Sequence, residues 1–108
     1  MLRPRPAQFA SVCAAMVLFS HPCLATNPEQ GKRLALTYCA KCHSIDKVTP
    51  SPLKIAPPFR TLHERYPVET LQEALAEGIV TGHPTMPEFR FDADQVGDFI
   101  DYLKTLER

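Results

Sequence analysis

The sequence predicts a small all-α domain that follows a cleavable N-terminal leader. Apolar residues recur at helical spacing in three stretches of the chain. Each of these stretches opens on a capping residue or a proline, as helices do. No run of residues has the composition and alternation of a β-strand. With 108 residues, the chain is long enough for one small domain.

Residues 1–25 are interpreted as a cleaved secretory signal peptide. Arg3 and Arg5 give a positive start, residues 9–19 are apolar, and small residues precede a cut after Ala25. The alternative is an uncleaved anchor helix. Eleven apolar residues span only about 16 Å as a helix, roughly half of a bilayer core. We therefore expect cleavage and no stable membrane span in the mature chain.

The mature domain is expected to comprise residues 26–108. A domain of 83 residues has a marginal core, so we expect a metal or cofactor inside it. The whole chain has 12 basic and 12 acidic residues, which argues against a nucleic-acid partner. Residues 26–65 carry seven basic and three acidic side chains, whereas residues 66–108 carry three and nine. Such a charge asymmetry can orient docking on a protein partner.

The first helix is predicted from Pro28 to about Tyr38. Asn27 is the expected N-cap, Pro28 occupies the first helical position, and Gln30 completes a capping-box-like pair. A glycine inside a helix costs about 1 kcal/mol relative to alanine, so Gly31 suggests close contact with another helix. One face of this helix carries Gly31, Leu34, Ala35 and Tyr38.

The middle of the chain combines proline-rich loops with short helical segments. Residues 44–58 contain four prolines and are expected to form an irregular loop, followed by a helical turn over 59–65. Pro67 opens a second helix that Gly78 ends. Residues 81–91 are expected to form another loop. The apolar face of this second helix consists of Val68, Leu71, Ala74 and Leu75.

The last helix begins after Asp92, which forms a capping box with Gln95. Its spacing predicts a continuous apolar stripe that faces the core. This stripe consists of Val96, Phe99, Ile100, Leu103 and Leu106. The other side carries Asp94, Asp98 and Asp101.

The sequence Cys39-Ala40-Lys41-Cys42-His43 is the main chemical motif. C-x-x-C-H is the signal for covalent attachment of a c-type haem, in which two thiols take the vinyl groups and the histidine binds iron. A secretory leader agrees with this chemistry, because bacterial haem attachment occurs outside the cytoplasm. The alternatives are half of a zinc site and a thioredoxin-like thiol pair, which would need a βαβ context.

The mature chain resembles the class I, single-haem cytochromes c of bacteria over nearly its whole length. Four features carry this resemblance in the family's order. A Gly-x-x-Leu-x-x-x-Tyr helix (31–38) precedes CAKCH, APPF (56–59) and HPTMPEF (83–89) follow, and VGDFIDYLKTL (96–106) closes the chain. The resemblance implies a cytochrome c-like fold with three main helices around one covalently bound haem c. It also implies that Gly31 meets the last helix near Phe99 and Tyr102.

The resemblance implies a set of cofactor-binding residues. Cys39 and Cys42 would attach the haem, and His43 and Met86 would be the axial iron ligands. The carbonyl of Pro57 would hold the ring of His43.

Met86 is also favoured without the family, because it is the one methionine of the mature chain and lies between prolines in a loop. A thioether is a soft ligand that favours Fe(II). His83, in the same loop, and His63 are the alternative ligands.

Further residues are expected around the haem. The apolar pocket lining is predicted to consist of Phe59, Leu62, Leu71, Leu75, Ile79, Phe89 and Phe91. Arg60 and Arg65 are candidate partners of the haem propionates. Lys41, Lys47 and Lys54 are candidates for a basic docking rim.

The function implied by the resemblance is that of a periplasmic single-electron carrier. Such a protein has no catalytic residues of its own and is not an enzyme; it takes an electron from a redox protein donor and passes it to an acceptor. We expect a monomer that forms transient complexes. The alternatives are a haem-bearing small subunit of a periplasmic dehydrogenase or oxidase, a peroxidase or ligand-binding haem protein, and a zinc module.

Overall fold

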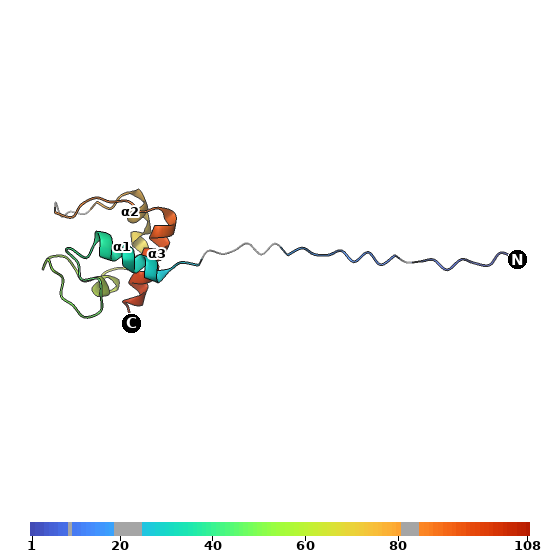
Figure 1. Ribbon diagram of the computed structural model, residues 1–108, viewed down its shortest axis with the longest axis horizontal. Coiled ribbons are helices and arrows are strands. Elements are labelled where there is room, and N and C mark those ends of the chain that lie inside the picture. The colour runs from blue at the N-terminus through green and yellow to red at the C-terminus, as the bar shows by residue number, and fades with distance from the viewer. Residues whose placement is uncertain (9, 19–24, 81–84) are drawn as a thin grey trace.

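The computed structural model describes residues 1–8, 10–18, 25–80 and 85–108 (Figure 1). Within these residues there are three α-helices and two 3₁₀ segments but no strand, which confirms the all-α class. The helices are α1 (Pro28–Tyr38), α2 (Leu71–Glu77) and α3 (Ala93–Thr105), and the 3₁₀ segments span Phe59–Glu64 and Val68–Thr70.

The N-terminal segment that the sequence analysis expects to be a leader has no helix or strand over residues 1–8 and 10–18, where it is exposed. It runs away from the helical domain in Figure 1. None of the helices in the described chain is long and apolar enough to cross a membrane. Cleavage after Ala25 stays a prediction.

α1 begins as the sequence predicts, but its capping box is only half formed. The Asn27 side chain accepts hydrogen bonds from the backbone N–H groups of Glu29 and Gln30, at 3.1 and 3.3 Å. The Gln30 side chain does not return the bond and instead accepts from Arg33 Nε at 2.8 Å. The Asn27 N–H donates to Asp98 Oδ1 at 2.7 Å, so a carboxylate of α3 replaces the expected partner. The N-terminus of α1 is thereby tied to α3.

The second helix is shorter than its apolar pattern suggests. Pro67 is followed by a 3₁₀ turn, because both the N–H and the hydroxyl of Thr70 donate to the Pro67 carbonyl, at 3.0 and 2.7 Å. The α-helical part begins only at Leu71. Gly78 ends it with a φ of 111°. Residues with a Cβ rarely adopt this value, so a glycine is expected where the helix stops. The turn predicted over 59–65 is the first 3₁₀ segment.

α3 and its N-terminal signal are confirmed in full. Asp92 Oδ1 accepts from the Gln95 N–H at 2.9 Å, and Gln95 Oε1 accepts from the Asp92 N–H at 3.0 Å. All five residues of the predicted apolar stripe are buried. The loop before α3 has no helix over residues 85–91, and residues 81–84 lie outside the described chain.

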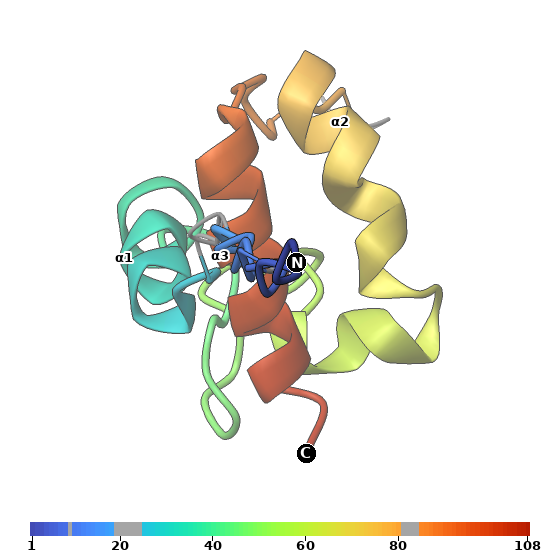
Figure 2. The same ribbon diagram turned by 90° about the vertical axis from the view of Figure 1, so that its right-hand side faces the viewer.

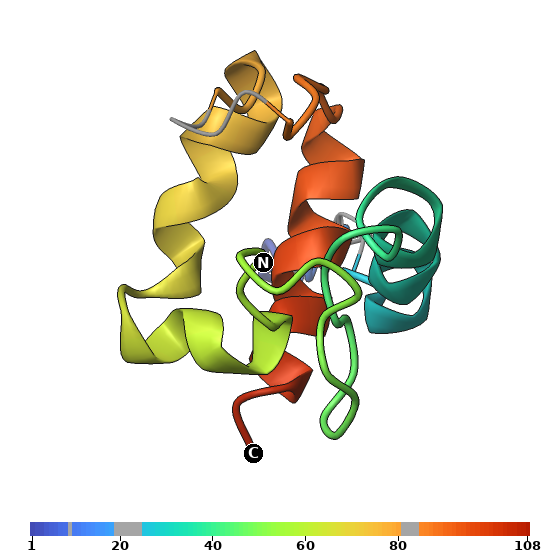
Figure 3. The ribbon, with the colours of Figure 1, turned by 90° about the vertical axis from the view of Figure 1, so that its left-hand side faces the viewer.

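α3 lies at the centre of the domain, with α1 on one side and α2 on the other (Figures 2 and 3). α1 crosses α3 at Gly31. A Cβ built on this glycine would collide with the carbonyl oxygen of Asp98 and lie 2.8 Å from Tyr102 Cβ. The crossing lies at the predicted place on α3: the nearest atoms belong to Tyr102 and to the Asp98 carbonyl, which directly precedes Phe99.

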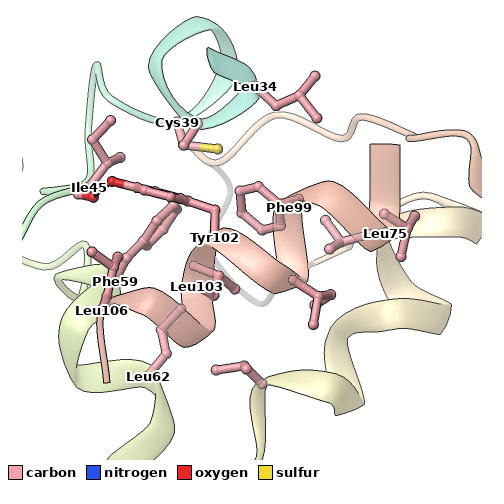
Figure 4. Packing of buried hydrophobic residues seen from close by; sticks show 14 of the residues in the cluster. Leu34, Cys39, Ile45, Phe59, Leu62, Leu75, Phe99, Tyr102, Leu103 and Leu106 are labelled. Atoms are coloured by element: carbon pink, nitrogen blue, oxygen red, sulfur yellow. Dashed lines mark hydrogen bonds between the residues drawn. The ribbon is translucent and has the colours of Figure 1, made fainter. Parts of the chain in front are cut away.

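The core forms around the buried face of α3 (Figure 4). Leu75, Leu103 and Val68 are the largest side chains that are almost fully buried. The ring of Tyr102 extends from α3 to the loop after the C-x-x-C-H motif, where its hydroxyl donates to the Ile45 carbonyl. α3 therefore joins the second helix and this loop in one core.

Replacing Gly31 by alanine tests the helix crossing. The new methyl would collide with the Asp98 carbonyl, which is part of the α3 backbone and cannot shift without the helix. Overpacking of this kind lowers the free energy of unfolding by about 1–3 kcal/mol. Gly97→Ala is the matched control within α3, because its Cβ would meet only the side-chain methyl of Thr26, at 3.0 Å. Denaturant unfolding of the two variants measures the difference. Equal effects at both positions would contradict the close crossing.

Candidate functional site

The C-x-x-C-H residues are positioned by a turn that continues from α1. The N–H of Cys39 donates to Ala35 O at 2.9 Å, as in a helix. The N–H groups of Cys42 and His43 then both donate to the Cys39 carbonyl, at 3.2 and 2.9 Å. This local winding brings residues three and four apart to the same side of the chain. The two thiols and the imidazole consequently line one cavity.

The His43 ring is held by the proline-rich loop. Nδ1 lies 2.8 Å from the carbonyl oxygen of Pro57. A carbonyl only accepts, so Nδ1 is the donor in this hydrogen bond, and Nε2 is the ring nitrogen that the bond leaves available. The ring also packs against Phe59, with centroids 5.0 Å apart. The histidine is thus oriented as a nitrogen ligand would need to be.

The cavity lies between the C-x-x-C-H turn, α2, α3 and the loop before α3. Its volume is about 550 Å³, within the range of about 300–1,000 Å³ that is typical of cofactor sites. It brings together the five residues that the sequence analysis named as cofactor-binding: Cys39, Cys42, His43, Pro57 and Met86. His63 is exposed and does not line the cavity, and His83 lies outside the described residues.

Six of the seven apolar residues predicted for the lining are found there: Phe59, Leu62, Leu71, Leu75, Ile79 and Phe89. The prediction is wrong for Phe91, which is buried behind the wall. Its ring packs edge-on against Tyr38 and Phe99, at centroid distances of 5.6 Å in both pairs. Phe91 shapes the wall from behind because its neighbours Tyr38, Phe89 and Phe99 separate it from the cavity.

The sequence analysis missed several wall residues, among them Tyr38, Leu53, Ile55, Tyr66 and Thr85. Leu53 and Ile55 remain 38% and 65% exposed, so they border the opening of the cavity rather than its interior. Tyr38, expected on the buried face of α1, is half exposed. The apolar character of Leu53 and Ile55 was a signal that they could line a cavity. A loop has no regular periodicity, however, so the sequence does not show which of its residues are buried.

The two arginines proposed as propionate partners lie in different places. Arg65 lines the cavity. Arg60 does not; its Nη1 donates to the Thr49 carbonyl at 2.7 Å and to the buried Ser44 hydroxyl at 3.1 Å. Arg60 therefore stabilises the loop after the motif, and the expectation that it faces the cofactor is wrong.

The three candidate lysines do not form one rim. Lys41 lines the cavity. Lys47 instead lines a separate hollow with residues from the C-terminal end of α3. Lys54 is exposed and does not line the cavity. The charged residues around the opening are Lys41 and Arg65.

The loop that carries Met86 is closed at its base by two backbone hydrogen bonds. The N–H of Ile79 donates to Phe89 O at 3.1 Å, and the N–H of Phe91 donates to Leu75 O at 2.8 Å. Met86 itself is half-buried and lines the cavity. The loop thus crosses from α2 to α3 and brings a thioether to the cavity that holds the imidazole.

Two groups in or near the site have displaced pKa values. Burial raises the pKa of the Cys39 thiol to about 12, the reverse of the shift that activates a redox thiol pair. In the loop after the motif, the pKa of Asp46 is lowered to about 2. The main cause is the hydrogen bond from the Thr49 hydroxyl, followed by those from the N–H groups of Thr49 and Val48.

The Asp46 carboxylate predicts an acid-sensitive loop. Its folded pKa lies below the ordinary value of about 3.9, so its contribution to stability is complete above that pH and is lost as pH falls toward 2. Thr49→Val removes the hydroxyl donor and should raise the pKa of Asp46 toward its ordinary value. An NMR titration of the Asp46 carboxyl in both proteins measures this. A wild-type value near 4 would contradict the loop geometry.

The donor set suits a macrocyclic metal cofactor better than a bare ion. Within the described chain, no group of three His, Cys, Asp or Glu side chains is placed to hold a metal. A zinc site needs at least three protein donors. A haem brings four ring nitrogens and needs only one or two axial ligands from the protein. A thiol pair, an imidazole and a thioether around an apolar cavity fit this second requirement.

The fold and the site therefore define a small helical haem protein. Comparison with protein families agrees: residues 28–107 match the family described as Cytochrome c. The chain belongs to this family, which implies a covalently bound haem c, haem-based electron transfer and redox partners. Members of the family are typically electron carriers rather than enzymes. A search of curated proteins gave no significant match.

Proposed function

We propose that this protein is an exported, periplasmic single-electron carrier whose haem c is held by Cys39, Cys42, His43 and Met86. One observation carries the proposal: two thiols, an imidazole and a thioether line the same largely apolar cavity, although Met86 is distant in sequence from the other three residues. The leader, with its two arginines and short apolar run, supports export. The haem, when bound, supplies one-electron chemistry by changing between Fe(II) and Fe(III).

Cys39 and Cys42 would each hold the cofactor through a thioether bond. Cys39 is 7% exposed at the end of α1, and Cys42 follows it by one helical turn. Because the turn is hydrogen-bonded back to α1, covalent attachment would anchor the cofactor to the helix that crosses α3. This anchorage supplies the additional stabilisation that a marginal core of this size needs.

His43 would bind the iron through Nε2. The Pro57 carbonyl accepts from Nδ1, which sets the tautomer, orients the ring and raises the basicity of the free nitrogen. The alanine that precedes Pro57 is buried, and the N–H of Phe59 donates to Ser44 O at 2.9 Å, so the loop presents this carbonyl from a fixed backbone.

Met86 would bind from the other loop as the second axial ligand. A thioether is softer than an imidazole and raises the reduction potential relative to a second histidine. If His43 and Met86 both hold the iron, the site would leave no position at the metal for a substrate. This arrangement favours an electron carrier over a peroxidase or a ligand-binding protein.

The surrounding side chains would control access to the cofactor. Phe59, Leu62, Leu75 and Phe99 form an apolar wall that keeps water away and limits solvent reorganisation during electron transfer. The opening is bordered by the exposed apolar residues Leu53 and Ile55 and by Lys41 and Arg65. A redox partner with an acidic surface around an apolar centre would fit this opening.

The visible spectrum tests the ligands. The reduced holoprotein should show sharp c-type bands, and the oxidised form should show the weak far-red band of a sulfur–iron bond. Met86→Ala should abolish the far-red band, whereas His63→Ala, which removes an exposed histidine outside the cavity, should leave it unchanged. His83→Ala should also retain the band. Absence of the far-red band from the wild type would overturn Met86 ligation.

Electron transfer from a small anion tests the charge at the opening of the cavity. Lys41→Ala should slow reduction by hexacyanoferrate(II) about two- to fivefold at low ionic strength, because a positive charge at the opening is lost. The difference should disappear at high salt. Lys47→Ala is the matched control, since it removes the same charge from a different hollow. Equal slowing by both variants would show that net charge, rather than the opening, governs the rate.

A further inference from the structure

The base of the Met86 loop contains a third interaction besides its two backbone hydrogen bonds. Arg90 lies between the two residues that make those bonds, Phe89 and Phe91. Its Nε donates to the carbonyl of Glu77 at 3.1 Å. Glu77 is the last residue of α2. Arg90 therefore connects the segment that follows the loop to the C-terminal end of α2, the helix that precedes the loop.

The C-terminal end of α2 is a favourable acceptor for this hydrogen bond. The last carbonyls of a helix have no partner within the helix and carry a partial negative charge. The last turn of α2 contains no basic residue of its own. The guanidinium of Arg90, from the far side of the loop, supplies both a donor and a positive charge to that helix end.

Close packing at Gly78 reinforces the same place. Gly78 has a φ of 111°, and a Cβ there would lie 2.7 Å from Glu88 Oε1. Glu88 thus packs against Gly78, and Arg90 is hydrogen-bonded to the preceding residue, Glu77. The returning residues Glu88 to Phe91 contact α2 and its end by packing, by two backbone bonds and by one side-chain bond.

We propose that Arg90 is a positioning residue for the axial ligand Met86, an inference that rests on the ligation proposed above. Arg90 does not line the cavity and has no contact there. Its bond to Glu77 stabilises the closed loop in which Met86 does line the cavity. Without this bond, the two backbone bonds remain, but opening the loop and withdrawing Met86 requires less free energy.

Imidazole binding to the oxidised holoprotein measures this opening, because an added ligand must first displace the methionine. Arg90→Ala should raise the apparent affinity for imidazole about three- to tenfold, the change expected when one hydrogen bond to a carbonyl is lost. Arg90→Lys keeps the charge and a donor and should recover part of the difference. The titration is done at a pH where imidazole is neutral, so that surface charge does not attract or repel it.

Arg33→Ala is the matched control. Arg33 is also an exposed arginine with an Nε hydrogen bond, at 2.8 Å to Gln30, but it lies on α1 away from the loop. This variant should bind imidazole like the wild type. An unchanged affinity in Arg90→Ala, or an equal increase in Arg33→Ala, would overturn the role of Arg90. A wild type without the far-red band would instead overturn Met86 ligation itself, so the two failures are distinguishable.

Discussion

The close crossing of α1 over α3 is the contact on which the rest of the structure depends. At Gly31 the two backbones approach so closely that a methyl group would meet the Asp98 carbonyl. Asp98 also accepts the N–H of Asn27, so the same segment of α3 fixes both the start and the first turn of α1. Because the C-x-x-C-H turn continues from α1 by hydrogen bonds to Ala35 and Cys39, this crossing places the two thiols and the imidazole relative to the core.

The loops of this small domain are stabilised by specific bonds rather than by extensive burial. The 44–58 loop is held by Arg60, by the bonds that Asp46 accepts and by the bond from the Tyr102 hydroxyl to Ile45. The Met86 loop is held at its base by two backbone bonds and by Arg90. These two loops supply the Pro57 carbonyl and the thioether, so their closure determines both sides of the cavity.

The combination of an apolar cavity and few polar groups explains how such a small domain carries out redox chemistry. The side chains that would bind the cofactor come from two segments, the C-x-x-C-H turn and the Met86 loop, and none of them needs to gain or lose a proton during electron transfer. With the proposed ligands, the protein would act through position and environment: ligand softness, the orientation of His43 and the exclusion of water. The exposed residues at the opening leave one face of the cavity available to a partner.

The sequence by itself predicted the three helices, the cap of α3 and the C-x-x-C-H motif, because each is encoded locally. Asp92 with Gln95, the stripe of α3 and the C-x-x-C-H spacing all depend on residues a few positions apart. Only the tertiary structure decided which residues face the cavity. It placed Phe91 behind the wall, turned Arg60 toward Ser44 and Thr49, separated Lys47 from Lys41 and gave Asn27 the distant partner Asp98. These outcomes depend on how segments far apart in the chain pack together, which helical periodicity and loop composition do not encode.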